Sequence, residues 1–344
     1  MNIRLVIRIV IPTAILVVAV WYVLRGVDVD SMIAIVFNAD PLILLASLPI
    51  VLISHVIRAR RWQTLLIPTG YETRLTTAFN SVMIGYAANT IIPRVGEILR
   101  GWVFARRQNI PVATAVSSVV IERVIDVISL LVAIGIVTFA VPDKMTSIIP
   151  GFTPAMVATR LALPVSLIAV ILILIVFTRI GNEFVERIVR PIYAKLADSL
   201  LHILVTFRHG MKVIAEPKLY ARLVLETIGI WVFYILPLWI VTLALPFESA
   251  HMIGFAEASI ILVVVAVGVT IAPTPGALGV YQTFAQAAFV ALAGATATEG
   301  LAFGILTWLV NYGVAFLVGA ISWFIESRNG ITWKNVHSAK EHVQ

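Results

Sequence analysis

The 344-residue sequence contains no cysteine. Disulfides, zinc–thiolate sites, iron–sulfur clusters and thiol catalysis are therefore excluded, and the redox compartment cannot be inferred. Charged residues are also scarce, at 12% of the chain, against about 25% in ordinary soluble domains. The sequence also lacks a nucleotide-binding loop, a cluster of metal ligands and a Ser–His–Asp order. We therefore expect no cofactor and no enzymatic activity.

Hydrophobic residues make up 60% of the chain, and the mean hydropathy is +1.01. Several apolar runs approach the roughly 20 residues that a helix needs to cross a bilayer, so we expect an all-α polytopic membrane protein. The net charge of +7 is better explained by basic cytoplasmic loops than by nucleic-acid binding. Arg4 and Arg8 precede an apolar run without an evident small-residue cleavage site, which indicates a retained first helix.

Two polar, Pro- and Gly-containing breaks interrupt this apolar sequence. The first is Asn89–Glu97 (NTIIPRVGE), and the second is Thr270–Gly276 (TIAPTPG), 180 positions later. Four residues recur in the two breaks: Thr90, Ile91, Pro93 and Gly96 reappear as Thr270, Ile271, Pro273 and Gly276. A break at membrane depth is tolerated only where protein or water satisfies the freed backbone groups. Matched breaks in two halves are typical of transporter binding sites.

The basic residues favour a topology in which both breaks lie in re-entrant hairpins, at 75–107 and 258–293. Six full spans then remain, at 5–24, 41–57, 112–140, 161–177, 223–245 and 301–324. We expect a multi-pass protein of the plasma membrane with both termini in the cytoplasm. In this topology 21 basic residues lie inside and three lie outside, namely Arg25, Lys144 and Arg160. This bias agrees with the positive-inside rule. Three crossings separate the hairpins, so they should form an inverted pseudo-repeat, with eight hydrophobic segments in all.

We interpret residues 1–344 as a single transmembrane domain with a first half at 1–140 and a second half at 223–324. Between them, residues 179–222 form the longest polar region, and apolar residues recur every four positions within it. This pattern predicts amphipathic helices that lie along the cytoplasmic membrane surface. A cytoplasmic hairpin packed on the helical bundle explains the pattern equally well.

The first break carries the charges that suit recognition of an anion. If a helix begins near Gly96, Glu97 and Arg100 share one face. A guanidinium at membrane depth, such as that of Arg94, can bind phosphate oxygens in a bidentate manner. The alternative is an internal ion pair that holds the loop. Asn89 could bind a headgroup or satisfy the broken backbone.

A second group of charges lies within the span at 112–140. Glu122 and Asp126 share a helix face, and Arg123 is three residues from Asp126. Charges at this depth should face the interior and be paired. They could relay ions or protons, or balance the arginines of the first break. We favour a structural salt-bridge network, because Arg123 already offers a partner.

The second break has no charge, so its backbone would supply any recognition. Its candidate substrate-binding residues are Pro273, Pro275, Gly276, Gly279 and Tyr281, with Gln282 nearby. We expect Asn311 and Tyr312 to form hydrogen bonds between helices. The arginine cluster at 58–61, with Trp62 and His55, is interpreted as the interfacial end of the second span.

Four motifs give the chain a family resemblance. They are Arg60-Arg-Trp62, Asn89 with Pro93-Arg-Val-Gly-Glu97 and Arg100, Glu122-Arg-Val-Ile-Asp126, and Pro273-Thr-Pro-Gly-Ala-Leu-Gly279. In this order they resemble the lysylphosphatidylglycerol synthase transmembrane-region family of flippase-like membrane proteins. The resemblance implies lipid flipping or the handling of lipid-linked sugars. It does not imply lysyl transfer, because the additional spans and the aminoacyltransferase domain of the synthases have no counterpart here.

By this resemblance, the motif residues should line or brace the lipid path: Asn89, Pro93, Arg94, Glu97, Arg100, Glu122, Arg123 and Asp126. The expected function is flipping of an anionic or phosphate-bearing lipid whose headgroup is held by Arg94 and Arg100. One alternative is an ion- or proton-coupled transporter of a soluble anion that uses Glu122 and Asp126. Another is a non-transporting membrane partner of a lipid-modifying enzyme or glycosyltransferase.

Overall fold

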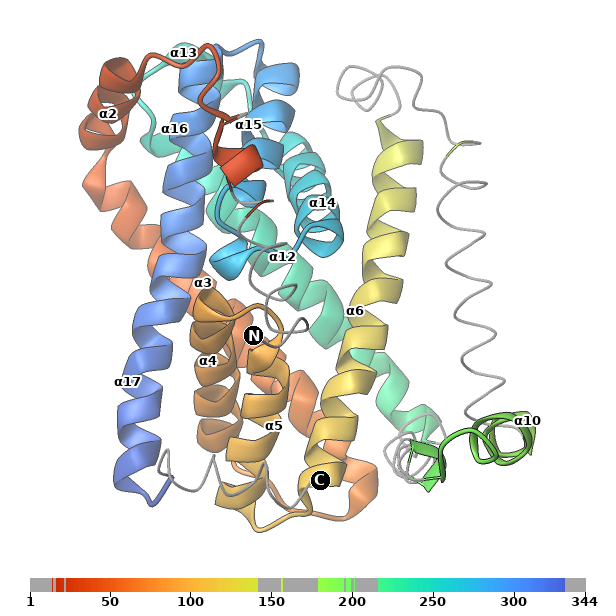
Figure 1. Cartoon of the computed structure of the whole chain (residues 1–344). Helices are drawn as coiled ribbons and strands as arrows, with labels where there is room; N and C mark the ends of the chain where they lie inside the picture. Colours follow the sequence, from red (N-terminus) through yellow and green to blue (C-terminus); the bar gives the residue numbers. More distant parts are fainter. Residues whose placement is uncertain are drawn as a thin grey trace.

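The computed structural model describes residues 23–141, 179–194 and 216–331, together with 17–21, 196–198 and the single residues 14, 156 and 201. Within these ranges the regular structure is helical throughout (Figure 1). The helices are α2 (Val29–Asn38), α3 (Pro41–Leu66), α4 (Leu75–Ile91), α5 (Val95–Gln108), α6 (Val112–Ala140), α10 (Arg179–Phe184), α12 (Tyr220–Ala244), α13 (Glu248–His251), α14 (Phe255–Ile271), α15 (Val280–Ala293), α16 (Ala297–Trp308) and α17 (Val314–Arg328).

Four helical segments of the described part are long and apolar enough to cross a membrane: Pro41–Thr69, Pro217–Ala244, Pro275–Ala293 and Ala297–Arg328. The last of these runs through α16 and α17, which a π-helical turn at Leu309–Gly313 joins without a break. The chain is therefore an all-α integral membrane protein, as its composition predicts.

Two aspartates of the acidic segment after the first predicted span act as helix caps. Asp28 accepts hydrogen bonds from the N–H groups of Asp30 and Ser31 at the start of α2. The Ser31 hydroxyl also donates to this carboxylate at 2.6 Å and lowers the pKa of Asp28. Asp40 caps α3 through the N–H of Leu42 at 2.8 Å. Both caps satisfy N–H groups that have no partner within their helix.

The two sequence breaks lie in two helical hairpins of equal length. In the first, α4 has 17 residues and α5 has 14. In the second, α14 has 17 residues and α15 has 14. The connections differ, since they are residues 92–94 in the first hairpin and 272–279 in the second. A residue with a left-handed backbone conformation follows the last helix of each hairpin. It is Asn109 after α5 (φ 54°) and Gly294 after α15 (φ 64°).

Each hairpin packs into its own apolar core with a long helix before it and another after it. Trp62 of α3, Val82 of α4, Phe104 of α5 and Val119 of α6 belong to the first core. The second core takes side chains from the corresponding helices, with Leu238 of α12, Ile261 of α14, Phe289 of α15 and Phe303 of α16, and also from α3 and α6. The order long helix, hairpin, long helix therefore occurs twice in the chain.

The tips of the two hairpins contact each other. In Figure 1, α4 and α5 occupy the lower part of the molecule, whereas α14 and α15 occupy the upper part. A Cβ atom added to Gly276 would lie 2.8 Å from Thr90 Cγ2, so the second break lies directly against the first. Trp308 Nε1 donates to the Gly276 carbonyl oxygen at 2.7 Å and holds the second tip to α16. Segments 180 positions apart in the sequence are thus neighbours.

Most of the predicted helix ranges within the described residues agree with the structure, and one end was wrong. Helix α6 covers the predicted range 112–140, and α12 lies close to the predicted span at 223–245. The predicted end of the second span at residue 57 is wrong, because α3 continues to Leu66. Arg58 and Arg61 did not end the helix, because they are paired inside the protein. The predicted span at 161–177, most of that at 5–24, and residues 195, 199–200 and 202–215 of the linker lie outside the described residues.

The open ends of the first hairpin are adjacent, because the Arg74 N–H donates to Gln108 Oε1 at 3.1 Å. Helix α13 lies at the opposite end of the molecule (Figure 1). Because the chain has no cysteine, single cysteines can report this arrangement. We predict that an impermeant maleimide labels Glu72→Cys and Arg106→Cys from one side of sealed vesicles, and Glu248→Cys from the other. Labelling of residues 72 and 106 from opposite sides would contradict the hairpin.

Candidate functional site

Polar side chains of the first break form hydrogen bonds within the break itself. Arg94 has a left-handed backbone (φ 66°) at the start of α5, and it is exposed. The Gly96 N–H donates to Asn89 Oδ1 at 2.7 Å, and Asn89 Nδ2 donates to Glu97 Oε1 at 3.4 Å. Asn89 therefore satisfies the broken backbone, which is one of the two roles that the sequence allows. Pro93 lies beside Arg94 in the turn.

Glycines allow α4 and α5 to approach closely below this turn. A Cβ atom on Gly96 would overlap the carbonyl oxygen of Gly85 and would lie 2.7 Å from Asn89 Oδ1. Small residues permit such backbone contact between membrane helices. Gly96 is buried and its N–H is already bonded, so its evident contribution is to the packing of the hairpin.

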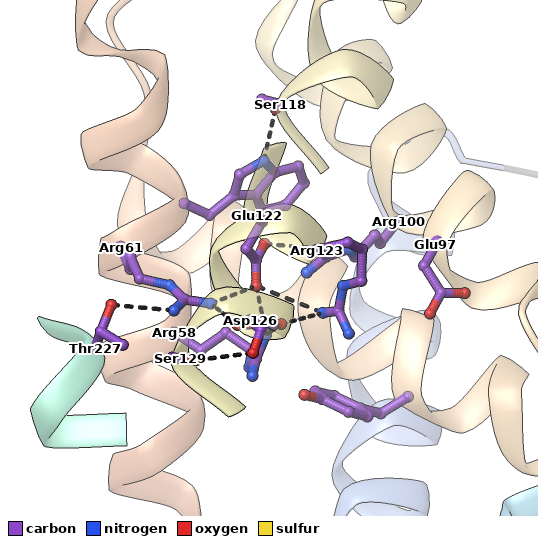
Figure 2. A network of polar contacts seen from close by, with 12 residues as sticks. Arg58, Arg61, Glu97, Arg100, Ser118, Glu122, Arg123, Asp126, Ser129 and Thr227 are labelled. Atoms are coloured by element: carbon purple, nitrogen blue, oxygen red, sulfur yellow. Dashed lines mark hydrogen bonds and ion pairs between the residues drawn. The ribbon is translucent and has the colours of Figure 1, made fainter. Parts of the chain in front are cut away.

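The predicted charges of α6 lie at the centre of a buried ion-pair cluster (Figure 2). Glu122 is fully buried and contacts Arg58 of α3 at 2.5 Å and Arg100 of α5 at 2.8 Å. Its third close partner is Arg61 of α3, at 3.4 Å. We call Arg58, Arg61, Arg100, Glu122, Arg123 and Asp126 the charge cluster.

Asp126 forms the second centre of the charge cluster. Its carboxylate contacts Arg58 at 3.0 Å, Arg123 at 3.4 Å, and Arg61 through a short hydrogen bond. The Glu122–Asp126 helix face was predicted to be paired, and this is confirmed. Arg123 is a partner, as expected, and Arg100 of the first hairpin is another. The arginines that α3 supplies were not expected.

Arg58 and Arg61 correct the interfacial interpretation of the arginine cluster. Their side chains are 6% and 1% exposed, whereas an interfacial side chain would reach water or headgroups. Trp62 is also fully buried, and its Nε1 donates to Ser118 Oγ at 2.8 Å. The spacing i, i+3 places both arginines on one face of α3. Together with the two interior acids expected in the span at 112–140, this spacing could have indicated their role.

Aromatic and imidazole rings surround the same cluster. Arg58 Nε donates to the Tyr234 hydroxyl at 3.0 Å, and the Tyr86 and Tyr234 hydroxyls are 3.3 Å apart. His55 packs against both rings, with centroids at 4.8 and 6.3 Å, and it is 5% exposed. The interfacial placement of His55 was therefore wrong. The guanidinium of Arg100 lies 5.1 Å from the Trp62 ring centroid, which is a favourable cation–π distance.

The second break has residues with positive φ angles and carries no charge. Gly276 and Gly279 have φ angles of 58° and 77°, which glycine adopts at little cost. The prolines, Pro273 and Pro275, flank Thr274, whose hydroxyl donates to the Leu278 carbonyl oxygen at 2.8 Å. This hydrogen bond satisfies one backbone carbonyl of the second break.

Tyr281, the remaining candidate of the second break, is buried. Its ring packs edge-on against Tyr312 at 5.6 Å. Asn311 Nδ2 donates to the Thr307 carbonyl oxygen at 2.8 Å within its own helix. The expected hydrogen bond from Asn311 to another helix is therefore corrected to a bond within the helix. It lies in the π-helical turn between α16 and α17.

Among the residues that the structure describes, no group of His, Asp and Glu side chains could hold a metal ion. The structure combines apolar helices, two hairpins whose tips are in contact, and a buried charge cluster that includes a residue of the first hairpin. They define an integral membrane protein with a charged interior.

The chain belongs to the family described as the lysylphosphatidylglycerol synthase TM region, whose model matches residues 9–319. It is similar to glycosyltransferase AglD of Haloferax volcanii, with 22% identity over 85% of this chain. The chain spans about half the length of AglD, of which 50% is matched. It is also similar to the UPF0104 membrane protein MJ1595 of Methanocaldococcus jannaschii, with 23% identity over 94% of this chain and 97% of the relative. No solved structure matches.

Gly96→Ala should destabilise the first hairpin, because the added methyl group would collide with the Gly85 carbonyl. We expect the free energy of unfolding to fall by about 1–3 kcal/mol, measured by denaturant titration in detergent micelles. Gly135→Ala in α6 is the control, because a Cβ there meets nothing within 4 Å. Alanine is the better helix former by about 1 kcal/mol, so this control should be neutral or slightly stabilising. Equal losses in both variants would contradict the packing role of Gly96.

Glu122→Gln removes the carboxylate charge that three buried arginines share. Breaking a buried pair leaves uncompensated charge, which costs about 3–5 kcal/mol. We expect a loss of this size in the free energy of unfolding. Glu183→Gln, which removes an exposed partner of Arg187, should cost no more than about 1 kcal/mol. A loss at Glu122 as small as that at Glu183 would show that the cluster contributes little to stability.

Proposed function

We propose that the chain is a flippase that moves an anionic or phosphate-bearing lipid between membrane leaflets. The observation that carries the proposal is the contact between the tips of the two hairpins at Thr90 and Gly276. We infer six full spans and two re-entrant hairpins, one entering from each side as an inverted pseudo-repeat. We place the chain in the plasma membrane with both termini in the cytoplasm. Sites at the interface of such repeats are open to either side in turn.

The side chains of the first hairpin support a route for a charged headgroup. Arg94 is exposed at the tip and contacts no carboxylate among the described residues. Arg100 follows six residues later on α5, about 9 Å along the helix, and belongs to the charge cluster. In this proposal Arg94 makes the first contact with the headgroup, and the cluster lies next along the path. The acyl chains remain in the lipid throughout, and no chemical step is assigned to the chain.

The alternatives differ in what the charges and partners do. An ion- or proton-coupled transporter of a soluble anion would need Glu122 or Asp126 to change partners, and both are held by arginines. A membrane partner of a lipid-modifying enzyme or glycosyltransferase would have little need for hairpins in contact at their tips. The name of AglD, a glycosyltransferase twice the length of the matched region, is compatible with a lipid-linked sugar as cargo.

Flipping can be measured with the purified protein in liposomes that contain fluorescent phosphatidylglycerol or phosphatidic acid. Arg94→Ala should slow flipping about tenfold, because a hydrogen bond to a charged group is worth about 1.5–3 kcal/mol. Arg106→Ala is the matched control, since Arg106 is an exposed arginine on the same helix. It should change the rate less than twofold.

Two results would count against the proposal. If Arg94→Ala and Glu97→Gln left flipping of every tested lipid unchanged at equal protein level, the assignment of the first break would fail. If the wild-type protein flipped no lipid but took up phosphate into the vesicles in a pH-dependent manner, the soluble-anion alternative would replace it.

A further inference from the structure

The charge cluster contains more positive than negative charge. Its basic members are Arg58, Arg61, Arg100 and Arg123, and its acidic members are Glu122 and Asp126. Two positive charges therefore have no carboxylate of their own within the cluster. Uncompensated charge is costly inside a membrane protein and marks functional sites there.

The carboxylates on the helices around the cluster do not balance this excess. Glu97 on α5 accepts a hydrogen bond from Asn89 and forms no ion pair among the described residues. Glu226 on α12 is paired with Arg222 at 3.0 Å and accepts from the Thr64 hydroxyl. His55, Tyr86 and Tyr234 add no negative charge in their neutral forms. The excess is therefore available to a ligand.

The guanidinium groups also retain unused hydrogen-bond donors. The Nε atoms of Arg61, Arg100 and Arg123 are buried and have no partner. Buried donors without partners are rare, and each one requires an explanation. The side chain of Arg123 is 41% exposed, whereas that of Glu122 is fully buried. Arg123 is thus the member through which a ligand can reach the cluster.

We propose that the charge cluster binds a phosphate group that brings two negative charges, as in a lipid phosphomonoester or diphosphate. Guanidinium groups bind phosphate oxygens in a bidentate manner, and two charges neutralise the excess. This inference rests on the proposed lipid transport and names the headgroup class for it. Free inorganic phosphate has the same chemistry, so the experiment must separate the two sources.

Equilibrium binding can be measured at pH 8 with the whole chain in nanodiscs of a zwitterionic lipid. The probes are phosphatidic acid as the phosphomonoester, phosphatidylglycerol as the single-charge lipid, and inorganic phosphate. Phosphatidic acid should bind about tenfold more tightly than phosphatidylglycerol, as expected for one additional charge-assisted interaction. Inorganic phosphate should compete only weakly, because it lacks the acyl chains.

Charge variants should move the affinity for phosphatidic acid in opposite directions. Arg123→Gln should weaken it about tenfold, and Arg123→Lys should retain most of it. Asp126→Asn leaves an excess of three charges and should strengthen binding. Arg222→Gln is the matched control, because its side chain is 42% exposed and is also paired with a carboxylate. Its affinity should be that of the wild type.

Several outcomes would overturn the proposal. Equal affinity for phosphatidic acid and phosphatidylglycerol would reject the two-charge headgroup. Loss of thermal stability in Arg123→Gln and Asp126→Asn, without opposite effects on affinity, would make the cluster purely structural. Binding of inorganic phosphate alone would reject a lipid as the source. Binding is measured separately from transport. Binding without flipping would reject the flippase function and support this phosphate-binding site. Flipping without binding would support the flippase function and reject this site.

Discussion

The pairing of the α3 and α5 arginines with the two carboxylates of α6 is the constraint on which this half of the protein depends. Glu122 and Asp126 lie in a predominantly apolar helix, and buried charges there require partners. Arg58 and Arg61 supply them from α3, and Arg100 supplies another from α5. Three helices are thereby fixed at one depth, and the first hairpin cannot shift along α6 without exposing charge to an apolar environment.

Side chains satisfy backbone groups in both breaks. Asn89 accepts from the Gly96 N–H in the first break, and Gln282 accepts from the Gly279 N–H in the second at 2.7 Å. Trp308 donates to the Gly276 carbonyl oxygen. Once these groups are satisfied, the tips can approach each other, and the contact between Thr90 and Gly276 results. The first tip carries an exposed arginine and the second carries backbone, so the two hairpins are chemically unequal.

Much of the helical organisation could be predicted from the sequence. Apolar length predicts α6 at 112–140, and the breaks predict both hairpins within a few residues. The end of α3 could not be predicted in this way, because Arg58 looks interfacial until its partner 64 positions away is known. The same holds for the role of Gly96, which depends on the backbone of Gly85 on the facing helix. Local patterns describe one helix, whereas these roles depend on a second.

The sequence by itself determined that the protein is a helical membrane protein with two matched breaks, because hydropathy and Pro–Gly punctuation act locally along the chain. The tertiary structure alone decided which charges pair, which of them lie inside, and that the two breaks touch. Arg58 and Arg61 looked like surface residues in the sequence, but they are buried and belong to the charge cluster. Charge becomes a structural constraint only when packing removes water, and packing is decided by the folded chain as a whole.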